Sequence, residues 1–200
     1  MLIKGQAAEN IRFADTMKKD CFDDTEMRFV IANPPFGQSW GGRMLMTVLK
    51  RLSAMTQKEN RQPFPCGLPA TGDMQLLFMQ HAVYKMQKGV GRAAIISNGS
   101  TAVLWKYNKR REPDQKIFAG ERSGRSNSWF ANTALLQYGH CNLCLYSFQG
   151  KRKERKGKVQ FINATDLWTP LQRSLGKKRR EISKDQIKLI TEVYADFVPC

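Results

Sequence analysis

The clearest chemical pattern in this chain is the tetrapeptide Asn33-Pro34-Pro35-Phe36. It directly follows an apolar run at residues 29–32, which is typical of a buried strand in a parallel sheet. Ligands of open α/β sheets bind beyond the carboxyl ends of the strands, which is where the tetrapeptide falls. Each proline fixes its own φ and restricts the residue before it, so the loop is stiff. We therefore expect a rigid loop that presents one amide, free carbonyl groups and an aromatic ring at the mouth of a sheet.

These groups suit the methylation of an exocyclic amine whose lone pair is delocalised into a ring. The side-chain oxygen of Asn33 and the carbonyl oxygen of Pro34 can both accept hydrogen bonds from an NH2 group, which would localise the lone pair on the nitrogen. Phe36 can stack on a base that has left the duplex. No strong general base is needed, because a sulfonium methyl donor is already activated. The alternative interpretation is a proline-stiffened turn after a strand, with Phe36 in the core.

Other segments extend the pattern along the chain. Together with the tetrapeptide, they resemble the methylation subunit of type I restriction–modification systems, an adenine-N6 DNA methyltransferase. The sequence Ile11-Arg12-Phe13-Ala14-Asp15-Thr16 is similar to the strand and acidic turn with which that family holds the adenine of S-adenosylmethionine. The remaining similar segments, in the order of the family, are 67–73, 91–99 and 158–197.

The resemblance implies an α/β fold with a Rossmann-like, S-adenosylmethionine-dependent methyltransferase sheet. It implies that the catalytic residues are Asn33, Pro34, Pro35 and Phe36. It implies that Asp15, Thr16 and Asn33 contact the cofactor, S-adenosyl-L-methionine. The implied partners are double-stranded DNA with a flipped adenine and the specificity and restriction subunits of the same system, in the cytoplasm.

The chain departs from the family in one large respect. No Gly-rich loop follows a strand anywhere in it, although such a loop would cradle the methionine end of the donor. In the family, the first strand and this loop lie upstream of the segments found here. We therefore expect a carboxyl-side fragment whose sheet is incomplete, and we expect the chain alone to be inactive.

The sequence predicts three parts. Residues 1–100 form the catalytic-domain portion, and residues 150–200 form a hairpin and closing helix of the same domain. Between them, residues 101–149 lose both strand and helix periodicity. With permitted codons, the stretch from Ala102 can be read one frame over as a string containing FYNTG, a segment expected of the family, so we interpret 101–149 as out of frame. For residues 43–57, an amphipathic helix and an out-of-frame acidic loop remain open.

Coarse periodicity predicts the elements that position these groups. Neighbouring parallel strands are expected at 10–14 and 28–32, and further strands at 91–97 and 158–162. Asp73 caps a helix that ends at Lys88-Gly89, and His81 and Phe78 lie on its apolar stripe, where packing is their expected role. Residues 183–186 form a capping box that opens a last helix.

Composition bounds the remaining possibilities. A chain of 200 residues that is 42% hydrophobic can bury one domain core, and its formal charge of +16 ordinarily favours nucleic acid. We interpret the basic runs 151–158 and 177–180 as solvated. Five cysteines without a secretory signal indicate a reducing compartment. Cys141 and Cys144 could be half of a zinc site, but no second pair exists, so no metal is expected. No apolar run is long enough to span a membrane.

Two further functions stay open at this point. Related sites with Asn-Pro-Pro and an aromatic residue also methylate a glutamine side chain or an RNA base. A non-catalytic function is the other, in which a degenerate basic domain only binds nucleic acid or a partner.

Overall fold

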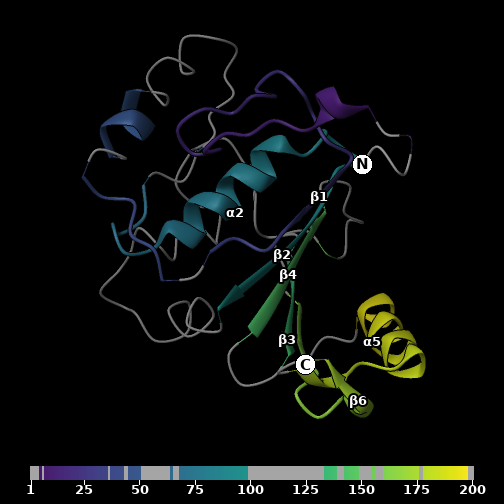
Figure 1. Ribbon diagram of the computed structural model, residues 1–200. Helices are drawn as coiled ribbons and strands as arrows, with labels where there is room; N and C mark the ends of the chain where they lie inside the picture. Colours follow the sequence, from purple (N-terminus) through teal and green to yellow (C-terminus); the bar gives the residue numbers. More distant parts are fainter. Residues whose placement is uncertain are drawn as a thin grey trace.

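The computed structural model of the chain describes residues 5, 7–35, 37–42, 45–50, 64, 68–98, 133–138, 142–148, 155, 160–175 and 178–197 (Figure 1). The elements, in chain order, are η2 (Ala8–Asn10), β1 (Phe29–Ala32), α2 (Met74–Lys85), β2 (Arg92–Asn98), β3 (Thr133–Tyr138), β4 (Asn142–Phe148), β5 (Gln160–Asn163), β6 (Thr169–Leu175), β7 (Lys178–Glu181) and α5 (Lys184–Asp196).

Five of the strands form one mixed sheet in the order β1-β2-β4-β3-β5. β1 and β2 are parallel, with Ala32 opposite Ile95, and β3 and β5 are also parallel. β4 runs antiparallel to both of its neighbours. Parallel neighbours need a crossover connection, and α2 lies in the one that joins β1 to β2 (Figure 1). A separate hairpin of β6 and β7 precedes α5.

The strongest local predictions are confirmed. The apolar run at 29–32 is β1, the run expected at 91–97 is β2, and the strand expected at 158–162 is β5. α2 begins after its N-cap, Asp73, but it ends at Lys85 rather than at Lys88-Gly89. It ends there because the next residues pair with the segment that leads into β1: the Met27 amide donates to the Lys85 carbonyl (2.6 Å) and the Gln87 amide to the Met27 carbonyl (2.9 Å).

The capping box of α5 is also confirmed. The Gln186 amide donates to the Ser183 hydroxyl (3.2 Å), and the Ser183 amide donates to the side-chain oxygen of Gln186 (2.9 Å). The two bonds satisfy amide groups that have no partner within the helix. At the other end, the Arg155 side chain donates to the carbonyls of Tyr194 (2.8 Å) and Ala195 (2.5 Å).

The strand expected at 10–14 is wrong. Residues 8–10 form the 3-10 helix η2, and residues 11–14 form no strand. Ile11 is 51% exposed and Phe13 is fully exposed. A strand needs a neighbour for its backbone groups, and among the described residues β1 pairs with β2 alone. Residues 11–14 do not pair with β1, so their backbone lies outside the sheet, although no other described strand covers the far edge of β1.

The structure also differs from the expectation for two irregular stretches. Within 101–149, the described residues form β3 and β4, which complete the sheet between β2 and β5. Residues 45–50 are helical, with Val48 buried, which is the amphipathic helix that was one of two alternatives for 43–57. Whether either stretch is translated out of frame stays a prediction about the coding DNA.

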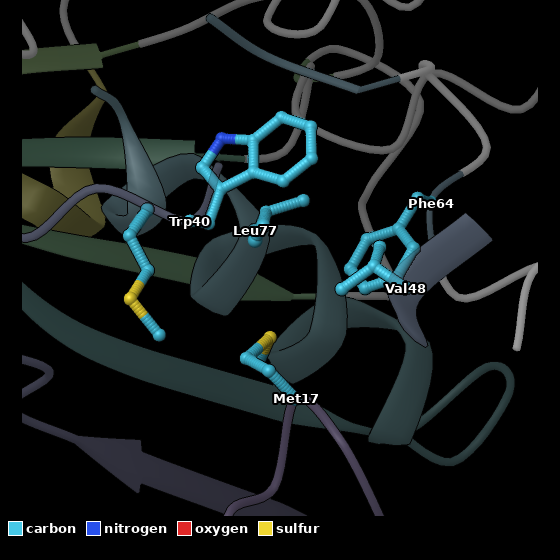
Figure 2. Packing of buried hydrophobic residues seen from close by; sticks show 6 residues of the cluster. Met17, Trp40, Val48, Phe64 and Leu77 are labelled. Carbon is cyan, nitrogen blue, oxygen red and sulfur yellow. The ribbon is translucent and has the colours of Figure 1, made fainter. Parts of the chain in front are cut away.

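The core brings distant parts of the sequence onto α2. Met17, Trp40, Val48 and Phe64 pack with the helix residues Met74 and Leu77 (Figure 2). Phe78 is partly buried against the same cluster and His81 is buried, so the expected packing roles of both are confirmed. On β2, the alternate residues Ala93, Ile95 and Ser97 are buried, which makes this the inner face of the sheet.

Gly91 marks the tightest approach between the loop after α2 and the start of β2. A Cβ atom at this position would lie 2.6 Å from the Gln87 amide nitrogen and 2.7 Å from the Met86 Cβ. We expect Gly91→Ala to lower the free energy of unfolding by about 1–3 kcal/mol, because backbone atoms cannot move aside as a flexible side chain can. Urea denaturation followed by circular dichroism measures the effect. Gly72→Ala is the control, since nothing lies within 4 Å of its added Cβ.

Among the residues that the structure describes, no helix has both the length and the apolar character needed to cross a membrane.

Candidate active site

The Asn-Pro-Pro loop lies where β1 ends. The last residue of β1, Ala32, pairs with Ile95 of β2. β2 continues for three more residues, to Asn98. β1 cannot continue in parallel with it, because a proline has no amide hydrogen to donate to the ladder. The chain therefore leaves the sheet at Asn33, at the carboxyl ends of two parallel strands, as predicted.

The three described residues of the tetrapeptide differ in burial. Asn33 and Pro35 are exposed, and Pro34 is buried. Phe36 lies outside the described residues, so its expected stacking role stays a prediction. Among the described residues, no hydrogen bond engages the Asn33 side chain, whose oxygen is therefore available to a ligand. A buried proline beside an exposed amide is the arrangement that a rigid loop with one outward-facing polar group requires.

Trp40 fixes the chain that follows this loop. Its amide donates to the Thr71 carbonyl (2.9 Å), and its indole Nε1 donates to the Ala70 carbonyl (2.8 Å). The ring is only 2% exposed and belongs to the core cluster shown in Figure 2. Ala70 and Thr71, in the segment that resembles the family, are thereby held to the chain that follows the Asn-Pro-Pro loop. Sequence reasoning missed this residue, and its signal was a lone tryptophan beside Gly41 and Gly42.

The amino end of α2 meets the carboxyl end of β2 at the same edge of the sheet. The Asn98 amide donates to the side-chain oxygen of Gln75 in the first turn of α2 (3.0 Å). Asn98 is half-buried, and the neighbouring Ser97 is fully buried. The edge thus carries polar groups from two elements besides the Asn33 loop.

The expected donor-binding residues, Asp15 and Thr16, lie on a separate exposed turn. Asp15 Oδ1 accepts from the Met17 amide (3.1 Å), and Oδ2 lies 3.2 Å from Lys18 Nζ, both being local contacts. Met17, the next residue, is fully buried and anchors the turn in the core. The hydrogen bonds and the ion pair described for Asp15 are all local to this turn. The turn and the Asn33 loop are both held to α2 by their neighbours.

The cysteines offer no site among the described residues. No group of three or more histidine, cysteine, aspartate or glutamate side chains there could hold a metal ion. Cys144 is a free thiol in β4, and burial raises its pKa. It is therefore a poor nucleophile. Cys141 lies outside the described residues.

Comparison with known proteins gives consistent results. A family profile described as N-6 DNA methylase matches residues 1–198. A curated relative, the methylase subunit of the type I restriction enzyme MjaIX from Methanocaldococcus jannaschii, is 24% identical over 98% of this chain, which spans 33% of that relative. The fold matches the methyltransferase subunit of a type I restriction–modification system from Streptococcus thermophilus with a TM-score of 0.65 and 18% identity, over 100% of this chain and 39% of that one.

The chain thus spans about a third of the length of the curated relative. The structural similarity shows a methyltransferase fold, of which the sheet described here is a part. Because the family match extends over nearly all of the residues, the chain belongs to the N-6 DNA methylase family.

Proposed function

We propose that the chain is the target-base portion of an adenine-N6 DNA methyltransferase, the methylation subunit of a type I restriction–modification system. The observation that carries the proposal is the exposed Asn33 amide, which follows β1 at the carboxyl edge of the sheet on a proline-stiffened loop. The family match supports the same activity. The proposed partners are double-stranded DNA and the specificity and restriction subunits of the system, and the proposed setting is the cytoplasm.

In the proposed mechanism, the chain prepares the amine rather than the methyl group. The Asn33 side-chain oxygen and the Pro34 carbonyl oxygen accept hydrogen bonds from the two N–H groups of adenine N6. These bonds draw the nitrogen toward tetrahedral geometry, so that its lone pair points at the incoming methyl group. Pro34 is buried and Pro35 follows it, which keeps both acceptors in place without reorganisation. Phe36 stacks on the flipped base, which has no other support outside the duplex.

The proposed methyl donor is S-adenosylmethionine, which when bound supplies an electrophilic methyl group on a sulfonium. The residues present fit part of such a donor. The Asp15 carboxylate is 41% exposed, and its Oδ2 contacts a surface lysine, Lys18, so it could hold the adenosine part of the donor. Thr16 is exposed beside it. Asp15 and Thr16 would thus hold the adenosine end of the donor, and Asn33 would contribute to the site where the methyl group is supplied.

The finer fold proposal is that this sheet is one half of a Rossmann-like sheet. Phe29 and Ile31 of β1 are 61% and 87% exposed, on the face that does not carry the buried Ala93 and Ile95. Parallel strands in α/β folds are normally covered on both faces. We propose that the Gly-rich donor loop, the first strand and the cover for this face belong to the two thirds of the relative's length that this chain does not span.

The test compares the chain alone with a fusion in which it replaces its aligned stretch of the Methanocaldococcus jannaschii subunit. Each is incubated with methyl-labelled S-adenosylmethionine and unmethylated duplex DNA, with RNA and protein as parallel acceptors. We expect label at adenine N6 for the fusion and none for the chain alone. Methyl transfer to RNA or to glutamine instead of DNA contradicts the proposed function. The absence of methyl transfer by a fusion that folds and binds the donor contradicts it as well.

A further inference from the structure

Three ionisable side chains are buried together between α2 and the segment that leads to β1. Asp20 lies in that segment, and His81 and Lys85 lie one helical turn apart on α2. Their side chains are 6%, 9% and 8% exposed. Lys85 Nζ is 3.1 Å from Asp20 Oδ2, and His81 Nε2 is 3.5 Å from the same oxygen. Charged groups are almost never buried unless they are paired, so this cluster has a structural purpose.

Lys85 also holds the backbone of the turn that follows Asp20. Its ammonium group donates to the Phe22 carbonyl and to the Asp23 carbonyl (3.3 Å), in addition to its ion pair with Asp20 Oδ2. Asp20 Oδ1 accepts from the Phe22 amide (2.9 Å). Burial acts to raise the pKa of Asp20, but the Phe22 amide, the Lys85 ammonium and His81 together hold it below its usual value. Asp20 is therefore an ionised, paired carboxylate.

The same segment has a second attachment to α2. The paired backbone of Met27 with residues 85–87 fixes it immediately before β1. Between Met17 and Met27, the described residues form turns and no helix or strand. Backbone pairing therefore does not determine the course of this stretch, and side-chain anchors must. Of these, Asp20 lies between the turn that carries Asp15 and β1, which precedes Asn33.

We propose that Asp20 is a positioning residue: held by Lys85 and His81, it clamps residues 15–27 onto α2 and so fixes the Asp15–Met17 turn relative to Asn33. The inference rests on the proposed function in one respect, because it takes this turn as the contact for the donor. α2 then serves as the common support for the donor side and the target side of the site. Met17 is a separate anchor for the turn, so loss of the clamp loosens the segment without detaching it.

Amide hydrogen exchange on the chain itself tests the clamp. In Asp20→Asn, which keeps the shape and removes the charge, we expect the Phe22 and Thr25 amides to exchange at least tenfold faster, while the Ile95 amide in β2 is unchanged. Asp24→Asn is the matched control, since Asp24 is exposed in the same segment. An equal increase in β2 indicates general destabilisation and overturns the clamp, as does no change at Phe22 and Thr25.

A second pair of variants separates the charge from simple packing. We expect Lys85→Met to speed exchange at Phe22 and Thr25, because it leaves a buried carboxylate without its ammonium partner. Lys85→Arg keeps the charge and should keep most of the protection. If Lys85→Met and Lys85→Arg speed amide exchange at Phe22 and Thr25 equally, the proposed role of the ion pair is wrong. If Asp20→Asn fails to fold, amide exchange at Phe22 and Thr25 is measured in His81→Gln, which retains the Asp20–Lys85 pair.

Donor affinity then tests the positioning role. Calorimetric titration of S-adenosylmethionine into the fusion, which supplies the Gly-rich donor loop, should give a dissociation constant about tenfold higher for Asp20→Asn and unchanged for Asp24→Asn. An unchanged constant alongside faster exchange overturns the positioning role while leaving the proposed function intact. A folded parent fusion that binds no donor counts instead against the proposed donor site, and the exchange experiment still decides whether the clamp exists.

Discussion

Asn33→Ala, introduced into the fusion that carries the complete methylase length, should reduce methyl transfer to adenine by about 10²–10³-fold, the range found when one preorganised hydrogen-bonding group is removed from a transition state. The loss should fall on the rate constant of transfer at saturating donor and DNA. In the proposed mechanism, Asn33 polarises the amine as the new bond forms, so little of its effect belongs to ground-state binding. The backbone carbonyl of Pro34 survives the substitution, which is why activity is reduced rather than eliminated.

The expected result has a structural basis and a control. Asn33 is exposed at the end of β1, and among the described residues its side chain makes no hydrogen bond, so alanine removes no internal contact there. Unfolding of the variant should therefore match that of the parent within about 0.5 kcal/mol. Asn10→Ala, at an exposed position of η2, is the matched control and should leave transfer unchanged. A variant that retains near-parent activity would show that the loop is a structural turn.

Trp40→Ala should lower the free energy of unfolding by about 3–5 kcal/mol, the usual cost of truncating a buried large aromatic side chain. Typical domains have only about 5–15 kcal/mol of stability in total, so this is a large share. Trp40 is 2% exposed and packs in the cluster with Met17, Val48 and Leu77. The substitution also leaves the Ala70 carbonyl without its indole donor. Urea denaturation followed by far-ultraviolet circular dichroism measures the change without relying on tryptophan emission.

Two comparison variants separate the contributions of Trp40. Trp40→Phe keeps most of the buried ring and loses the Nε1 hydrogen bond, so we expect a loss of about 1–3 kcal/mol. Trp168→Ala removes a half-buried tryptophan whose main described contact is Arg180 stacked at 3.9 Å, and it should cost about 1 kcal/mol. Equal costs for Trp40→Ala and Trp168→Ala would contradict the role of Trp40 as the anchor of the Asn-Pro-Pro loop.

Local signals predicted the elements that local physics controls. A short apolar run followed by two prolines located β1 and its end, because proline itself terminates the ladder. Ser183 and Gln186 predicted the start of α5, because a capping box lies within four consecutive residues. Asp73 is the N-cap residue of α2, as predicted, although its carboxylate makes no capping hydrogen bond.

Errors arose where a distant partner decides the outcome. Residues 10–14 alternate like a strand, yet no described strand lies beside them, and Phe13 is fully exposed. α2 ends at Lys85 because the backbone of Met27, far away in the sequence, forms hydrogen bonds with the Lys85 carbonyl and the Gln87 amide. β3 and β4 lacked a periodic signal and form strands through pairing with β2 and β5. Strand propensity depends on such neighbours more than on sequence.

The sequence by itself determined the candidate chemistry: an asparagine and a proline carbonyl at the end of a parallel strand, in an arrangement that the methylase family shares. Only the tertiary structure decided what holds that chemistry in place. Trp40 donates hydrogen bonds to Ala70 and Thr71, about 30 residues away in the sequence. Asp20 forms an ion pair with Lys85 and lies close to His81, both about 60 residues away. The reason is physical: a hydrogen bond or buried ion pair depends on distance and burial, which exist only after folding has brought its two members together.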